Sequence, residues 1–274
     1  WEKLLDDVDP HMCTGGFIHG ILEGNARINP NFTIAAKDFP LICSRYGSGS
    51  FGERSCNHNL GHILLAEKAG SINKAIKVCN EVVDSGAKYE CLSGMFMENI
   101  FRDNLVAHEV GEKLPWNKER AKEIEKLCKS FNGIVAQACW KEISYMYSGI
   151  FNNDPDKVFE ACYKAPQKSY GDACYIYGAG NMVVFSRFNP DKLGEVCTKY
   201  SESDSLFKQC MIQIIGSMLT SAEQFITQTV GLCNNAPTWF QETCFINIGR
   251  VLGKRKIASN QKREELCNQI PTRF

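Results

Sequence analysis

Apolar residues recur along this chain at spacings of three and four positions, in segments of about 12–15 residues. Before Cys128, for example, Leu127 and Ile124 lie one and four positions upstream, and the segment ending at Cys197 repeats this spacing. Proline after a capping side chain, as at Asp154-Pro155, marks the start of such a segment. No alternation of apolar and polar residues competes with this pattern, which predicts an all-α protein.

Cysteines divide the helical segments into two kinds that alternate along the chain. Segments of the first kind open at Cys13, Cys56, Cys91, Cys139, Cys174, Cys210 and Cys244. Segments of the second kind end at Cys43, Cys79, Cys128, Cys162, Cys197, Cys233 and Cys267. The first set recurs at steps of 43, 35, 48, 35, 36 and 34 residues. Two helices in a period of about 35 residues are typical of tetratricopeptide-like repeats, which predicts a right-handed α-solenoid of about seven disulfide-stapled helical hairpins.

The repeat extends over residues 1–274, so we expect a single helical-repeat domain. Residues 1–42 form an irregular N-terminal repeat, and an insertion near residues 101–120 lengthens the third. Insertions on a regular scaffold often carry contacts, which makes His108 and Trp116 candidate contact residues. A longer connecting loop is the alternative. Glycines that recur in the first kind of segment, such as Gly61 and Gly94, are expected to let neighbouring helices approach closely.

The composition indicates the compartment. Fourteen cysteines in 274 residues, evenly spaced, favour an oxidising environment. No apolar stretch approaches the ~20 residues of a transmembrane helix. The chain begins at Trp1 without a signal peptide, so we expect that a leader or anchor preceded it. The triplet Asn31-Phe32-Thr33 makes Asn31 a candidate glycosylation site. Together these features predict an extracytoplasmic protein: secreted, periplasmic or on the outer face of a membrane.

The charge balance bears on partners. Lys plus Arg and Asp plus Glu both number 31, and no basic run occurs. Nucleic-acid binding calls for a basic excess or stripe, so protein partners are expected instead.

Two cysteine pairings fit the repeat. The shorter joins Cys43–Cys56, Cys79–Cys91, Cys128–Cys139, Cys162–Cys174, Cys197–Cys210 and Cys233–Cys244. The longer includes Cys13–Cys43, Cys56–Cys79, Cys174–Cys197 and Cys244–Cys267.

Helix geometry favours the shorter pairing. Cys79 and Cys91 each lie six residues from the turn at Ser85, so an antiparallel hairpin places them at one level. Around the turn at Gly70, Cys56 and Cys79 would be offset by about 7 Å at a rise of about 1.5 Å per residue, too far for a disulfide. The shorter pairing leaves Cys13 and Cys267 without partners.

Histidines are concentrated near the N-terminus. His19 and His62 each lie six residues after an opening cysteine, His58 and His62 share one helix face, and Met97 occupies the same position of the next repeat. Together, His19, His58, His62 and Met97 suit a metal ion, and imidazole with thioether favours copper over zinc. The competing interpretation is that these histidines are structural. Neighbouring helices lie about 8–10 Å apart, so equivalent positions need not converge on one ion, and such histidines commonly bond to a neighbouring carbonyl.

Enzyme motifs are missing from the sequence. It contains no GxSxG, HExxH, P-loop or GxGxxG pattern, and most thiols are expected in bridges. The sequence therefore predicts a non-enzymatic protein without a cofactor, with copper or zinc as the alternative.

The succession helix, cysteine, short loop, cysteine, helix resembles cysteine-rich variants of the tetratricopeptide solenoid in secreted bacterial proteins, from Cys43 to Cys267. CNHNLGH (Cys56–His62) and GMFMENI (Gly94–Ile100) are similar to C-x-H-x-x-G-H and F-M-E-N patterns of exported repeat proteins. The chain departs from them in Asn59, where glycine is usual, and in lacking the first histidine in its first repeat. The resemblance implies a binding module or assembly scaffold without catalysis.

The Lys-, Asn- and Ile-rich composition is also similar to that of exported archaeal proteins, including the helical accessory subunit of archaeal ammonia monooxygenase. This resemblance implies an interaction or scaffold role as an accessory subunit of a membrane-bound complex, such as a copper-dependent monooxygenase. A copper- or zinc-binding or delivery protein that uses the N-terminal histidines is the alternative.

Overall fold

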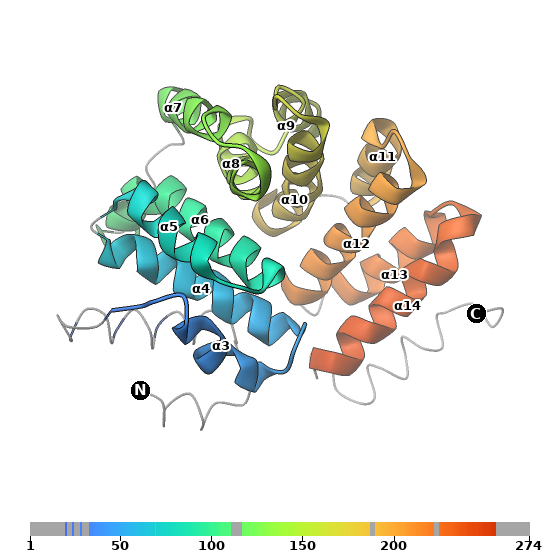
Figure 1. Ribbon diagram of the computed structural model, residues 1–274. Coiled ribbons are helices and arrows are strands. Elements are labelled where there is room, and N and C mark those ends of the chain that lie inside the picture. The colour runs from blue at the N-terminus through green and yellow to red at the C-terminus, as the bar shows by residue number, and fades with distance from the viewer. Residues whose placement is uncertain are drawn as a thin grey trace. The chain divides into compact units, whose positions relative to one another are not determined.

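A computed structural model of the chain describes residues 33–68, 70–110, 117–186, 190–221 and 225–255, with the single positions Gly20, Gly24 and Ile28 (Figure 1). Over these ranges the chain forms twelve α-helices and no strand, which confirms the all-helical prediction for this part. The right-handed solenoid arrangement stays a prediction.

The chain divides into two compact units, Trp1–Pro115 with Glu119–Ile143 and Trp116–Lys118 with Ser144–Phe274. Unit 1 contains α3 (Asp38–Cys43), a 3₁₀ turn (Ser44–Tyr46), α4 (Phe51–Glu67), α5 (Ile72–Glu81), α6 (Ser85–Val110), most of α7 (Lys118–Lys129) and the first part of α8 (Gly133–Ile150). Unit 2 contains the rest of α8, α9 (Pro155–Cys162), α10 (Lys168–Ser186), α11 (Pro190–Tyr200), α12 (Asp204–Ser221), α13 (Phe225–Asn235) and α14 (Thr238–Arg255). That the whole chain is a single repeat domain stays a prediction.

Short-range signals in the sequence set the helix starts. The Ser50 hydroxyl accepts the Glu53 amide at 3.0 Å, and the Glu53 carboxylate accepts the Gly49 amide at 2.6 Å. The first bond satisfies an amide that a helix start leaves without a partner, and the second holds the residue before the N-cap against the first turn. Asp154 caps α9 in the same way, with Pro155 in the first turn as the sequence predicts.

The insertion near residues 101–120 begins as helix rather than as loop. α6 continues through Val110, and α7 begins at Lys118. His108 lies on this extension, where only the backbone is described, and Trp116 lies outside the described residues.

Six disulfides staple the helical hairpins, and all six follow the shorter pairing: Cys43–Cys56, Cys79–Cys91, Cys128–Cys139, Cys162–Cys174, Cys197–Cys210 and Cys233–Cys244. Their Cα atoms are 5.4–5.8 Å apart, and every cysteine is at most 1% exposed. From α5 onward, each staple joins a short helix of 8–12 residues to the long helix of 18–26 residues that follows it. Cys13, Cys267 and Asn31 lie outside the described residues.

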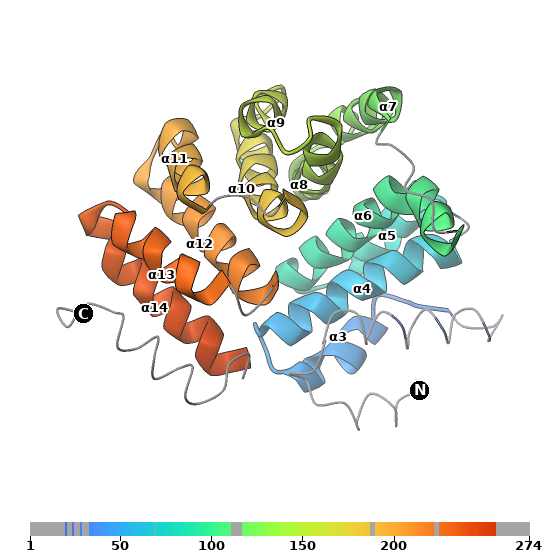
Figure 2. The same cartoon turned by 180° about the vertical axis from the view of Figure 1, so that it is seen from behind.

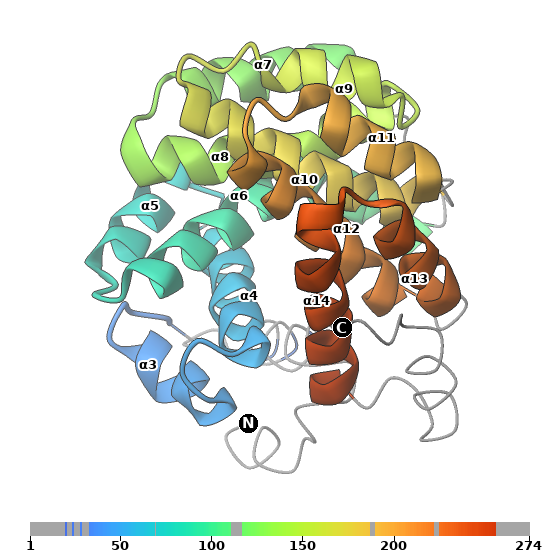
Figure 3. The ribbon, with the colours of Figure 1, turned by 90° about the vertical axis from the view of Figure 1, so that its right-hand side faces the viewer.

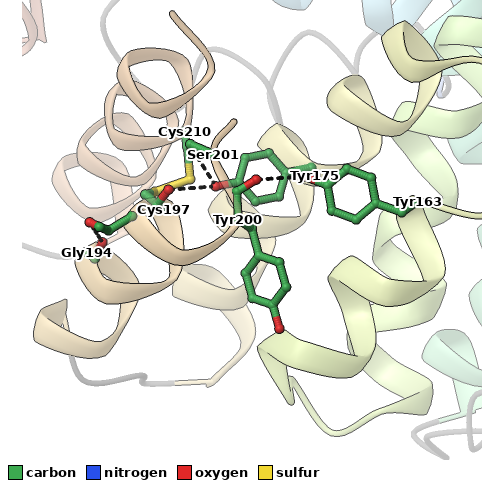
Figure 4. Close-up of a disulfide and its surroundings, with 8 residues drawn as sticks. Tyr163, Tyr175, Gly194, Cys197, Tyr200, Ser201 and Cys210 are labelled. Atoms are coloured by element: carbon green, nitrogen blue, oxygen red, sulfur yellow. Dashed lines mark hydrogen bonds between the residues drawn. A yellow bond between two sulfur atoms is a disulfide. The ribbon is translucent and has the colours of Figure 1, made fainter. Parts of the chain in front are cut away.

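A tyrosine of unit 2, Tyr175, forms hydrogen bonds with the end of α11 beside one of these disulfides (Figure 4). The Tyr175 hydroxyl lies beside the Cys197–Cys210 disulfide, 3.2 Å from the Cys197 carbonyl oxygen, to which it donates, and 3.1 Å from the Ser201 hydroxyl. Burial raises the pKa of Tyr175, so its hydroxyl stays a donor to the Cys197 carbonyl.

The long helices of each unit pack against one another, α4 with α6 in unit 1 (Figure 2) and α10 with α12 and α12 with α14 in unit 2 (Figure 3). The contact between α4 and α6 requires glycine. A Cβ at Gly94 would lie 1.8 Å from the His58 carbonyl oxygen, and one at Gly61 would lie 2.1 Å from the Cys91 carbonyl oxygen. The two backbones therefore touch there, as the recurring glycines predict.

None of the helices in the described ranges is both long and apolar enough to cross a membrane.

Candidate functional site: a polar cluster in unit 1

Three of the four side chains predicted to bind metal meet between α4 and α6. The His58 and His62 rings stand edge to face on α4, with centroids 4.9 Å apart. His58 Nε2 lies 3.3 Å from the sulfur of Met97 on α6. His19 lies outside the described residues. The i, i+4 spacing of the histidines and the matching repeat position of Met97 thus bring these groups together.

Each of these imidazoles has a carboxylate at its other nitrogen. His62 Nδ1 is 3.0 Å from Glu98 Oε2, and His58 Nδ1 is 3.7 Å from Glu90 Oε2. Both carboxylates come from α6. The Glu98 contact favours the tautomer of His62 in which Nδ1 carries the proton and Nε2 carries the lone pair. At His58, the Glu90 carboxylate and the Met97 sulfur are both acceptors, so they compete for the ring proton.

α8 extends this set of contacts with a buried lysine. Lys141 Nζ lies 2.6 Å from Ser93 Oγ, 3.4 Å from Glu90 and 3.3 Å from Glu142. The Ser93 hydroxyl also donates to Glu142. The Lys141 and Glu142 side chains are 6% and 1% exposed, and Ser93 is fully buried.

We refer to this set of side chains as the polar cluster: His58, His62, Glu90, Ser93, Met97, Glu98, Lys141 and Glu142. Its α8 end is closed to solvent, whereas the side chains of His58, His62, Glu90 and Glu98 are 10–20% exposed.

The polar cluster shifts two pKa values. Burial alone would raise the pKa of Glu90, but the His58 contact and the Lys141 charge overcome it and hold that pKa at about 2. Burial lowers the pKa of His58 below its usual 6.5, against the opposing pull of Glu90. Glu90 is therefore a carboxylate that contacts both His58 and Lys141, and His58 is a neutral imidazole near pH 7.

A serine next to a lysine invites comparison with nucleophilic catalysis, which the surroundings disfavour. A lysine acts as a general base only in its neutral form. Lys141 sits between the carboxylates of Glu90 and Glu142, which favour the ammonium ion, and no surface of Ser93 is open to a substrate. These contacts instead tie α6 to α8.

The motifs of the sequence do not single out the other five members of the cluster, which are Glu90, Ser93, Glu98, Lys141 and Glu142. One signal was available: His58, Ser93 and Lys141 each lie two residues after the cysteine of their long helix. Equivalent positions of packed repeats face the same way, so three polar residues there indicate a polar row.

The equivalent position in unit 2 is apolar throughout. Ile176, Ile212 and Ile246 lie two residues after the cysteines of α10, α12 and α14. Ile176 and Ile212 are half-buried, and Ile246 is 46% exposed. We refer to these three residues as the isoleucine row.

Unit 2 also has a surface pocket of about 480 Å³ where α9 begins beside α11. Asp154, Asp156, Glu195 and Lys199 contribute to its lining. The Asp156 carboxylate already accepts from Lys199 and from the Tyr200 hydroxyl, and Asp154 pairs with a lysine of its own helix. The charges of this pocket are thus largely compensated from within the unit.

Across the described parts of the chain, no three or more His, Cys, Asp or Glu side chains form a group that could hold a metal ion. Comparisons with known protein families, with curated proteins and with solved structures gave no match to this chain.

Proposed function

We propose that this chain is a non-enzymatic, extracytoplasmic interaction module that serves as a scaffold for a protein partner. The role fits an accessory subunit of a membrane-bound complex, of which a copper-dependent monooxygenase is one example.

The isoleucine row carries this proposal. It places an apolar side chain at the same position of three helices that pack in order, each reached by solvent. Isolated apolar residues on a surface are ordinary, but a regular row across neighbouring helices suits an apolar segment of another polypeptide.

The disulfides support the compartment and the scaffold role. Six buried cystines belong to an oxidising environment, because cytosolic thiols are kept reduced. They also limit the opening of each hairpin, so the row is presented on a rigid support, which lowers the entropic cost of binding a partner.

The composition of the polar cluster supports the absence of catalysis. Its serine is fully buried, and its lysine is held between two carboxylates. The serine and the lysine of the cluster therefore do not supply an accessible nucleophile with a neutral lysine as its base.

The test is native electrophoresis and chemical crosslinking in extracts of the source organism, with the wild-type chain compared with Ile212→Glu and Ile246→Glu. We expect the wild type to migrate in an assembly larger than the 30.8 kDa chain and both variants to leave it. Thr198→Glu, at an exposed position of the short helix α11, is the matched control and should stay in the assembly.

Circular dichroism verifies that each variant is folded. A wild-type chain that is monomeric and gains no crosslink in the native extract contradicts the proposal, as does an assembly that both isoleucine variants leave unchanged.

A further inference from the structure

The open end of the polar cluster places an imidazole nitrogen against a thioether sulfur, two groups that can each bind a metal ion. His58 Nε2 points at a thioether sulfur at 3.3 Å rather than at a carbonyl or carboxylate oxygen. A nitrogen and a sulfur bound to one metal ion at about 2.0 and 2.3 Å, at a near-tetrahedral angle, would be separated by a similar distance. This contact therefore has the spacing of two ligands on one ion.

The second imidazole adds a third donor. With Nδ1 held by Glu98 at 3.0 Å, the lone pair of His62 is on Nε2. The His62 ring stands edge to face against His58 with centroids 4.9 Å apart. A carboxylate on the outer nitrogen of each histidine is the arrangement that orients imidazoles toward a metal and strengthens them as ligands.

The charges of the cluster also favour a cation. Two carboxyl side chains, those of Glu90 and Glu142, share the ammonium group of Lys141, and the carboxyl group of Glu98 pairs with His62. The Glu142 side chain is 1% exposed, and its Oε2 has no hydrogen-bond partner among the described residues. Buried carboxylates are normally paired with cations, so one added positive charge would improve the balance.

We propose that His58 Nε2, His62 Nε2 and Met97 Sδ bind one soft metal ion of the copper(I) class, with Glu90 and Glu98 orienting the two imidazoles. Thioether and imidazole together select a soft, monovalent ion over zinc or a hard cation. The site is separate from the isoleucine row, so it stands or falls independently of the proposed interaction role.

The test is a titration of the purified full-length chain with copper(I) under nitrogen, in competition with the chromophoric chelator bicinchoninate. Ascorbate is the reductant, because thiols and phosphines would open the disulfides. We expect one copper(I) per chain, an X-ray absorption spectrum with nitrogen and sulfur neighbours, and weaker binding of zinc in the same assay.

Variants separate metal binding from helix packing. His58→Gln and His62→Gln should each weaken copper(I) binding by about 100-fold, and Glu98→Gln, which alters only the orienting group, by about 10-fold. Met97→Leu keeps the volume of the side chain and should remove the sulfur neighbour from the spectrum. The matched control is Met95→Leu, at a fully buried position of the same helix, which should bind as the wild type does.

Circular dichroism and thermal melting without metal confirm that the variants are folded. Absence of copper(I) binding by the folded wild type overturns the proposal. So do unchanged affinities of His58→Gln and His62→Gln, a spectrum without sulfur, tighter binding of zinc than of copper(I), or a loss that only His19→Gln produces.

Discussion

The two units use the same stapled hairpin and fill its equivalent position with opposite chemistry. Two residues after the long-helix cysteine, unit 1 has His58, Ser93 and Lys141, whereas unit 2 has isoleucine three times. In unit 1 these side chains reach across helices to carboxylates, and in unit 2 they remain partly in solvent. The disulfide and the helix pair thus determine the position of this side chain, whereas its residue type can vary between polar and apolar.

The difference also changes what holds the long helices together. In unit 1, α6 and α8 are joined by a buried ammonium ion and its carboxylates, an arrangement that costs desolvation and is sensitive to the loss of either partner. In unit 2, neutral hydrogen bonds of the Tyr175 hydroxyl join α10 to the end of α11. Each of these bonds contributes less to the free energy of unfolding than a buried ion pair, and the loss of one partner costs less.

The largest expected effect comes from removing the buried lysine. Lys141→Met leaves Glu90 and Glu142 without their cation and should lower the free energy of unfolding by about 3–5 kcal/mol. Ile212→Ala, at the equivalent position of α12, should cost about 1 kcal/mol because this side chain is only half-buried. Denaturant unfolding with the disulfides intact measures both, and adding Glu142→Gln to Lys141→Met should recover part of the loss. A cost below 1 kcal/mol for Lys141→Met would show that the charge pairing is unimportant.

The second-largest effect is expected on acidification, which should destabilise the polar cluster. Glu90 has a pKa of about 2 in the folded chain against 4.5 ordinarily, so the unfolded chain takes up its proton first. The stabilisation is complete above pH 4.5, is lost as the pH falls toward 2, and amounts to about 3 kcal/mol. The lowered pKa of His58 acts in the same direction below pH 6.5. The free energy of unfolding should depend less on pH across this range for Glu90→Gln than for the wild type. An equal dependence on pH in the two proteins would contradict the lowered pKa of Glu90.

A pair of glycine substitutions should have opposite signs. Gly94→Ala places a Cβ 1.8 Å from the His58 carbonyl oxygen, so α4 and α6 must separate at a cost of about 2–3 kcal/mol. Gly216→Ala on α12 meets nothing within 4 Å and should stabilise the protein by about 0.5–1 kcal/mol through helix propensity. Thermal melting gives both shifts, and equal shifts for the two variants would refute the backbone contact in unit 1.

A small, local loss of stability is expected in unit 2. Tyr175→Phe removes the hydroxyl that donates to the Cys197 carbonyl and should cost about 1 kcal/mol. Hydrogen exchange at the end of α11 should increase while exchange in α4 stays the same. A change spread evenly over both helices would show that Tyr175 does not act locally.

Much of the fold follows from short-range signals in the sequence. Asp154 and Pro155 define the start of α9 because capping depends on neighbouring residues. The disulfide pairing follows from helix rise around a turn, which explains why Cys79 joins Cys91 rather than Cys56. The spacing of His58 and His62 likewise places them on one face without knowledge of the tertiary structure.

The polar cluster depends on packing between distant segments and was only partly predictable. Lys141 and Ser93 are 48 residues apart, with the insertion between them, and nothing in the sequence around Lys141 indicates that it is buried. The repeat position shows that these residues can share a row, but their burial requires α6 and α8 to meet. For the same reason, the continuation of α6 through Val110 could not be distinguished from a loop.

Because every described cystine is buried, the rate at which each disulfide is reduced can be used to measure local opening of its hairpin. A reductant reaches these sulfur atoms only when a hairpin opens, so the rate of reduction at each staple reports how often that hairpin opens under native conditions. Trapping the freed thiols with an alkylating reagent and mapping the peptides would rank the six stapled hairpins by local stability in one experiment, without any substitution.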